Sequence, residues 1–553
     1  MQVVTLVLVL LLAVVVSAFA TRLSPLKLPA PLLQMVIGAG FHYAGFEVEF
    51  HSHLFLLLFI PPLLFLDGWR IPKGALFRDW RPILALAIGL VVFTVLGIGL
   101  FVHWLIPAVP LAVAFALAAI LSPTDPVAVG AMTATSPLPS RLTHILEGEA
   151  LLNDATGLVC FTFAVSAAMT GQFSLTGAGV SFVLVSGGGV LIGLGVTWAI
   201  GRLNRALIVR AGEEPATQIL VSLLMPFAAY LTAEHLHVSG ILAAAVAGIA
   251  MHYGELAGRA LASTRMQRNA VWDTVQTTLN GIIFVLLGQQ LPHFVERLPT
   301  AAGEIGVRSV PQLLGYLSAI TAALVVLRFV WVWFAMHLTV LRASRRGQQR
   351  RVASTRVLAV TATAGVRGAI TLAGILTLPT TLPSGAPFPA RDVAIFLAMG
   401  VILLSLLLAT VALPILTRGL ATLPSAGSAS AAAKRTSEAT ARTAAAEAAV
   451  RGIERMLTEA SPNPETSVAR AEAAMHLIAA YRRRLEYGDP HEDETDAQRV
   501  ADAERELHLR ALEAEREELY RLRMERGIDD DVHRALLREI DLVEASLTPA
   551  GAH

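Results

Sequence analysis

The sequence predicts an all-α polytopic membrane protein that ends in a polar helical tail. Of its 553 residues 55% are hydrophobic and only 15% are charged, and the mean hydropathy is +0.62. These values lie outside the range of ordinary soluble domains. Apolar runs close to the length of about 20 residues that crosses a bilayer recur from the N-terminus to Leu416. Beyond them, residues 419–553 carry 18 Lys and Arg against 26 Asp and Glu.

The apolar runs predict about thirteen transmembrane helices, two of which are short and depend on their neighbours for the assignment. No basic stretch precedes the first run, which favours a membrane helix there over a cleaved signal peptide. The predicted spans are 3–20, 30–41, 52–67, 82–106, 110–133, 147–170, 179–201, 216–235, 238–252, 272–291, 312–341, 357–379 and 392–417.

The charges of the loops predict the orientation of these spans. Loops that follow odd-numbered spans contain 19 Lys and Arg, whereas the alternate loops contain only Arg297, Arg308 and Arg391. Because Lys and Arg accumulate on the cytoplasmic side of a membrane protein, we expect the N-terminus outside and the C-terminal tail in the cytoplasm.

The composition divides the chain into three parts. Residues 1–418 form the predicted transmembrane domain, 419–433 a flexible linker of small residues, and 434–553 a cytoplasmic tail rich in Ala, Glu, Arg and Leu. These residues favour helices, and their apolar positions recur at helical spacing. The single cysteine, Cys160, excludes an intrachain disulfide.

The first candidate site is Leu121-Ser-Pro-Thr-Asp-Pro126, in the middle of the fifth span. Pro123 and Pro126 remove backbone donors, so the helix should open around Thr124 and Asp125. Unwound backbone at membrane depth is either buried in protein or lines a water-filled cavity. It exposes carbonyl groups that can bind cations. A simple kink in which Asp125 caps the second half of the helix is the alternative.

The second candidate is EGEALLNDATGLV, residues 147–159, where three acids lie within eight residues. A charge near the bilayer centre costs at least about 2.5–3.5 kcal/mol, so such acids indicate function. Asp154 is the deepest of the three, while Glu147 could be a solvated helix-end charge. Glu149 lies between them.

Two intramembrane arginines provide the opposite charge. Arg367 lies between glycines in GVRGAITLAG, and Arg328 lies in ALVVLRFVWVW. A buried guanidinium needs anionic partners, and Glu149 and Asp154 are the candidate partners of Arg367. Arg328 could instead anchor helices by bonding to carbonyl groups.

These residues are suited to the exchange of a small cation for protons. Burial disfavours the charged form of a carboxylate, so a buried acid holds either a proton or a metal cation. Hard cations prefer oxygen ligands, which Asp154, Glu149, Asp125 and Thr124 supply.

Four motifs together resemble the NhaP-like family of monovalent cation:proton antiporters. They are SPTDPVAV, EGEALLNDATGLV, YLTAEHLHVSGILAAAVAGI and GVRGAITLA, in four separate predicted spans. The resemblance covers about residues 1–418. It implies a fold of inverted repeats with two crossing broken helices, alternating access and a homodimer in the cell membrane. It implies no cofactor and no nucleic-acid partner, only lipid, monovalent cations and protons.

The resemblance also implies roles for particular residues. Asp154 would be the main ion- and proton-binding acid, and the Asn153-Asp154 pair goes with electroneutral exchange in this family. Glu149, Asp125 and Thr124 would support the site, with Arg367 neutralising Glu149. Ala150 departs from the pattern, because family members often have Ser or Thr there, which leaves Li⁺ and K⁺ open beside Na⁺.

Two other classes of protein are the alternatives. A cation channel would conduct without proton coupling, but the sequence contains no carbonyl-filter repeat of the kind that potassium channels use. An intramembrane aspartyl protease would need Asp125 and Asp154 as a dyad, and the chain lacks a Gly-x-Gly-Asp motif.

Overall fold

A computed structural model describes most of the membrane part of the chain and short pieces of the tail. The described residues are 2–23, 29–46, 52–71, 73–125, 140–171, 175–256, 262–296, 303, 310–344, 355–417, 447–455, 474–479, 511–512, 514–516, 518–519, 521, 536 and 539–544. Contacts divide the chain into two units, Met1–Leu423 and Pro424–His553.

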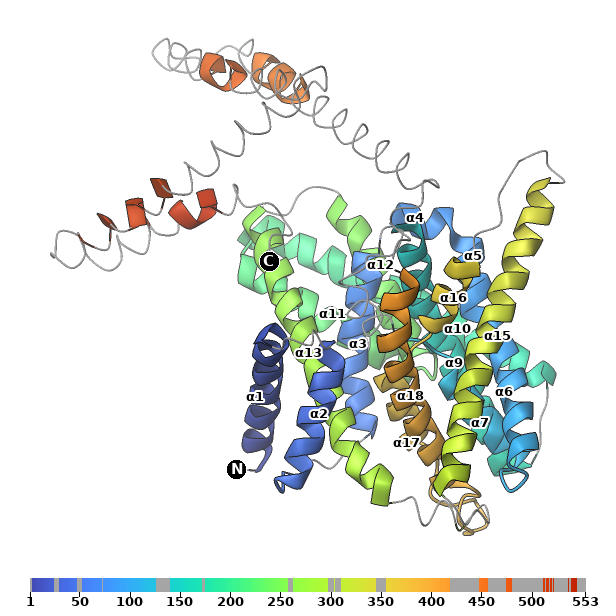
Figure 1. The fold of residues 1–553 in the computed structure, drawn as a ribbon. Helices are drawn as coiled ribbons and strands as arrows, with labels where there is room; N and C mark the ends of the chain where they lie inside the picture. The colour runs from blue at the N-terminus through green and yellow to red at the C-terminus, as the bar shows by residue number, and fades with distance from the viewer. Residues whose placement is uncertain are drawn as a thin grey trace. The chain divides into compact units, whose positions relative to one another are not determined.

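The described part of the first unit is almost entirely helical (Figure 1), and its one β-bridge joins Thr381 to Pro387. The helices are α1 (Gln2–Leu23), α2 (Ala30–Tyr43), α3 (Ser52–Arg70), α4 (Lys73–Arg78), α5 (Trp80–Leu84), the π-helix η1 (Ala85–Leu90), α6 (Val91–Leu105), α7 (Leu111–Leu121), α9 (Ser140–Thr170), α10 (Leu175–Ala211), α11 (Pro215–His235), α12 (Gly240–Leu256), α13 (Ala262–Glu296), α15 (Val310–Ser344), α16 (Thr355–Thr363), α17 (Ala369–Leu376) and α18 (Arg391–Thr417).

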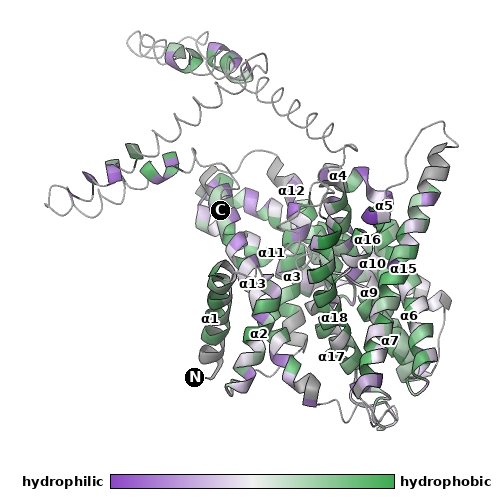
Figure 2. Cartoon of the chain, in the orientation of Figure 1, coloured by the Kyte–Doolittle hydropathy of each residue, from purple (hydrophilic) through white to green (hydrophobic). Residues whose placement is uncertain are grey.

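Each predicted span coincides with a helix or with an interrupted helix. Seven helices among the described residues are long and apolar enough to cross a membrane, and apolar residues cover most of α1, α15 and α18 (Figure 2). Shorter helices such as α2, α7 and α12 account for further predicted spans. The all-helical membrane fold is confirmed, and the count of thirteen crossings stays a prediction.

Two predicted spans lose their helical structure partway along the described residues. The fifth predicted span is helical as α7 only to Leu121, and residues 123–125 have no regular structure. This confirms the break predicted around Thr124 and Asp125, although residues 126–133 of the span lie outside the described residues. The twelfth span is interrupted at residues 365–368, between α16 and α17.

Several buried clusters pack the helices of the membrane part together, and one of them, with residues from α3, α9, α12, α13 and α17, connects the two described next. One buried cluster joins α3, α11, α12 and α13 around Phe65 and Trp272, whose rings stack at 5.4 Å. A larger cluster is built mainly from α6, α7, α9, α15, α17 and α18. Figure 1 shows α1, α2 and α13 at one edge and α6, α7 and α15 at the other, in agreement with the helix contacts.

Glycines allow unusually close backbone contact between α2 and α13. A Cβ atom at Gly38 of α2 would overlap the carbonyl of Val285, and one at Gly288 of α13 would overlap the carbonyl of Met35. Only glycine permits this approach of two helix backbones. The two helices therefore form one rigid wall.

The described residues of the second unit are helical, as the sequence predicts. Within it, Arg516 donates a hydrogen bond of 2.6 Å to Asp541 and a second one to Glu544. The predicted boundaries at residues 418 and 433 lie outside the described residues, so the limits of the linker stay predictions.

Candidate functional site

The two interrupted helices border a cavity inside the membrane part. The volume of this cavity is about 60 Å³, several times the ~10–15 Å³ that a single water needs on the same measure. The cavity therefore has room for a small cation and a few waters. Its walls come from α3, the unwound segment after α7, α9, α13 and α17.

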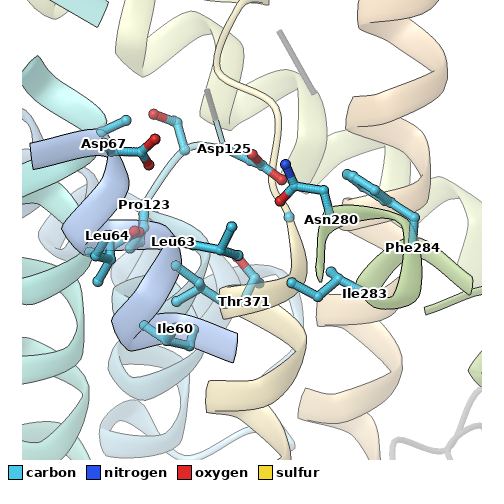
Figure 3. Close-up of a pocket in the computed structure, with 15 residues that line it drawn as sticks. Ile60, Leu63, Leu64, Asp67, Pro123, Asp125, Asn280, Ile283, Phe284 and Thr371 are labelled. Carbon is cyan, nitrogen blue, oxygen red and sulfur yellow. The ribbon is translucent and has the colours of Figure 1, made fainter. Parts of the chain in front are cut away.

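Three carboxylates line this cavity. Asp154 enters from α9, Asp125 from the unwound segment and Asp67 from α3. Asp154 is only 5% exposed, and within the described part of the chain no cation pairs with it. Figure 3 shows the carboxylates of Asp67 and Asp125 directed toward the same space. The arrangement is an oxygen-rich, net negative site of the kind that binds a hard cation.

The two helix breaks are joined directly to each other. The backbone N–H of Asp125 donates to the carbonyl of Val366 at 2.8 Å, and the Arg367 Nε donates to the carbonyl of Leu121 at 2.9 Å. Each bond satisfies a backbone group that unwinding leaves without its helical partner. The bonds therefore hold Asp125 beside the start of α17.

Asp125 lies against Gly368, the residue that precedes α17. A Cβ atom at Gly368 would overlap the Asp125 carboxylate, so this position requires glycine. The N-terminal end of a helix carries partial positive charge, which favours an ionised carboxylate there. Asp125 is thus positioned by backbone on both sides.

Replacing Gly368 by Ala is expected to lower cation-driven proton transport at least about tenfold. The added methyl group displaces the Asp125 carboxylate, and a displacement of about 1 Å is enough to impair a functional group. Transport in everted vesicles, normalised to inserted protein, measures the effect. Gly195→Ala on α10 is the control, since a Cβ there meets no atom within 4 Å. Equal activity of the two variants would refute the role assigned to Gly368.

The predicted partner of Glu149 is wrong. Both carboxylate oxygens of Glu149 accept hydrogen bonds from Arg328, at 2.5 Å and 2.7 Å, and the two side chains are 1% and 3% exposed. Arg328 also donates to the carbonyl of Thr361 at 2.9 Å. Glu149 does not line the cavity, and its two oxygens are occupied by a bidentate ion pair. It therefore neutralises Arg328, and it is not placed to hold a transported cation.

Arg367 anchors helix ends by bonding to backbone carbonyls, which is the role that the sequence left open for Arg328. Its guanidinium bonds to the carbonyls of Leu121 and Gly365, and its backbone N–H donates to the Ser405 hydroxyl at 3.2 Å. Both carbonyls belong to residues at the helix breaks. The expectation that Arg367 pairs with Glu149 fails because α15, and not the interrupted helix, places a guanidinium in line with Glu149.

Asn153 and Thr124 are brought together, but only Thr124 lines the cavity. The Asn153 amide is fully buried and donates to the Thr124 hydroxyl at 3.0 Å. Asn153 therefore fastens α9 to the unwound segment, next to Asp154.

Three polar residues of the cavity were missed from the sequence: Asp67, Asn280 and Thr371. Asp67 falls at the predicted end of the third span, where an acid is usually solvated. The signal available for it was a lone carboxylate after the apolar run FIPPLLFL. Asn280 and Thr371 are uncharged, and single amides or hydroxyls in apolar helices seldom indicate a site.

An acidic cavity at the junction of two interrupted helices defines a secondary transporter of small cations. A sequence profile of the family described as "Sodium/hydrogen exchanger, transmembrane" matches residues 8–419. The chain belongs to this family and is a sodium/proton antiporter. The family is one of transporters, and nothing in it supports the cation-channel alternative.

Two relatives illustrate the likeness in sequence. The chain is 41% identical over 547 residues to the uncharacterized Na(+)/H(+) exchanger YjcE of Escherichia coli (strain K12), covering 98% of each protein. It is 42% identical over 425 residues to the sodium, potassium, lithium and rubidium/H(+) antiporter of Bacillus subtilis (strain 168). That alignment covers 75% of this chain and 62% of the relative.

The fold also resembles a solved structure. The sodium proton antiporter MjNhaP1 from Methanocaldococcus jannaschii superposes with a TM-score of 0.53, over 76% of this chain and 99% of MjNhaP1. The two sequences are 18% identical, so this likeness concerns the fold alone.

Proposed function

We propose that this antiporter exchanges one Na⁺ for one H⁺ by alternating access, with Asp154 as the group that binds either ion. The observation that carries the proposal is the burial of Asp154 in a cavity that it shares with Asp67 and Asp125, without a cationic partner among the described residues. A carboxylate in this setting gains from binding a proton or a metal cation, and each excludes the other.

The other charges support this division of roles. Glu149 and Arg328 neutralise each other outside the cavity. Asp125 lies at the N-terminal end of α17, whose partial positive charge favours an ionised carboxylate. Of the two remaining cavity acids, Asp67 lies in the last turn of α3 and Asp154 in the middle of α9, so we assign the change of charge during transport to Asp154. Binding Na⁺ or H⁺ places the same charge on it, which supports electroneutral exchange of one cation for one proton.

The range of cations and the cellular setting belong to the same proposal. The B. subtilis relative is named for sodium, potassium, lithium and rubidium, so Li⁺ and K⁺ are further candidate substrates. We place the protein in the cytoplasmic membrane as a homodimer without a cofactor, with its N-terminus outside and its tail in the cytoplasm. Its expected role is pH and sodium homeostasis.

Competition between protons and cations tests the proposal. In proteoliposomes, the half-saturating Na⁺ concentration should rise about tenfold per pH unit on the acid side of the Asp154 titration, because each proton bound removes one cation site. An imposed membrane potential should leave the exchange rate unchanged. A half-saturating concentration independent of pH would contradict a shared site, and a potential-dependent rate would contradict one-for-one exchange.

A further inference from the structure

Asn280 is a polar side chain that the mechanism above does not use. It lies in the apolar sequence LNGIIFVLLG of α13 and lines the cavity. No hydrogen-bond partner for its amide occurs among the residues that the structure describes. Figure 3 shows the amide directed toward the carboxylate of Asp125. A polar group half-buried in an apolar helix is costly unless something binds it.

The helix that carries Asn280 is held rigidly. Backbone contacts at Gly38 and Gly288 hold α13 against α2, and Gly281, which follows Asn280, packs against Val14 of α1 and Gln34 of α2. A ligand on a rigid helix keeps its position without losing entropy when the ion binds. Asn280 thus enters the cavity from a fixed wall.

Besides Asn280, the side chains that line the cavity include two with a neutral oxygen, Thr124 and Thr371. The Thr124 hydroxyl already accepts a hydrogen bond from Asn153, and Ala150 presents only a methyl group to the cavity. A small cation needs several oxygen ligands, and neutral ones complete the shell without adding charge. The amide carbonyl of Asn280 is available for this purpose.

We propose that Asn280 is a specificity-determining ligand, which completes the cation shell together with Asp125 and Asp154. The inference rests on the proposed function and adds to it the neutral ligand from α13. The amide serves both states of the site because it has an acceptor and two donors. Its oxygen binds the cation, and its N–H groups face the carboxylates when no cation is present.

Replacing Asn280 by Ala is expected to raise the half-saturating Na⁺ concentration about tenfold, because one contact to a charged group is lost. The maximal rate should stay within about twofold of the unaltered protein. The increase should be larger for Li⁺ and Na⁺ than for K⁺, since small cations interact more strongly with each oxygen. Exchange in proteoliposomes, driven by each of the three chlorides in turn, measures these values.

Rescue distinguishes a ligand from a structural residue. Adding Ala150→Ser to Asn280→Ala returns an oxygen to the same cavity. The double variant should reverse at least half of the increase in the logarithm of the half-saturating Na⁺ concentration. The control is Thr277→Ala on the exposed face of α13, which should leave all three affinities unchanged. If Asn280→Ala does not accumulate, Asn280→Asp is used, and its added acid should strengthen Na⁺ binding at pH 9 and make the affinity fall more steeply toward pH 6.

The outcomes separate this inference from the function on which it rests. If Asp154→Asn is inactive while Asn280→Ala keeps its cation affinities and their order, Asn280 is not a ligand and the proposed function stands. A fall in maximal rate alone in Asn280→Ala would also overturn the inference. If Asp154→Asn transports normally, the proposed function itself fails.

Discussion

Replacing Asp154 by Asn should lower the rate of cation-driven pH change in everted vesicles at least about a hundredfold. The reason is that the substitution removes the group that binds both ions. Asparagine keeps the size of the side chain and removes the titratable carboxylate. Because Asp154 has no ion-pair partner among the described residues, the substitution leaves no buried charge unpaired, and the variant should insert and fold.

The matched control for this variant is Asp392→Asn. Asp392 lies in the first turn of α18, outside the cavity, and its side chain is 37% exposed. It should transport at the rate of the unaltered protein. Retained exchange in Asp154→Asn, at normal abundance, would remove Asp154 from the centre of the mechanism.

Removing one partner of the buried pair between Glu149 and Arg328 should destabilise the protein strongly. Arg328→Gln leaves the Glu149 carboxylate buried without a counter-charge, which costs about 3–5 kcal/mol. The double variant Glu149→Gln/Arg328→Gln removes both charges and should recover most of this loss. Thermal unfolding of the purified protein in detergent compares Arg328→Gln, Glu149→Gln and the double variant with the unaltered chain.

An exposed arginine calibrates this experiment. Arg202 lies on the surface of α10, where it contacts Trp198, and Arg202→Gln should change the unfolding temperature little. Additive effects of the Glu149 and Arg328 substitutions would show that the pair is not coupled, and would contradict its role as a structural link between α9 and α15.

The sequence carries enough information to locate the helices and the break at Thr124 and Asp125. Hydropathy is a property of each segment by itself, and Pro123 and Pro126 remove backbone donors on either side of Thr124 and Asp125. Asp154 was also evident, because a carboxylate so deep in an apolar run is costly without a function. The position of each of these residues depends on its own neighbours in the chain.

Contacts between helices could not be read in the same way. Arg328 and Arg367 both lie in apolar segments, and nothing in their spacing tells which guanidinium reaches Glu149. The outcome depends on the relative height of α9, α15 and the interrupted helix, which packing sets. Asn280 was missed for the same reason, since its importance comes from the cavity that it faces and not from its own segment.

The close contact between α2 and α13 has a consequence for how the protein is made. Gly38 meets Val285, so about 250 residues of chain separate the two sides of the contact. At a synthesis rate of about 5–20 residues per second, the ribosome needs roughly 12–50 s to produce the second after the first. During that interval α2, with only 14 residues, enters the bilayer without the helix that covers it, and assembly of this wall waits for the later half of the chain.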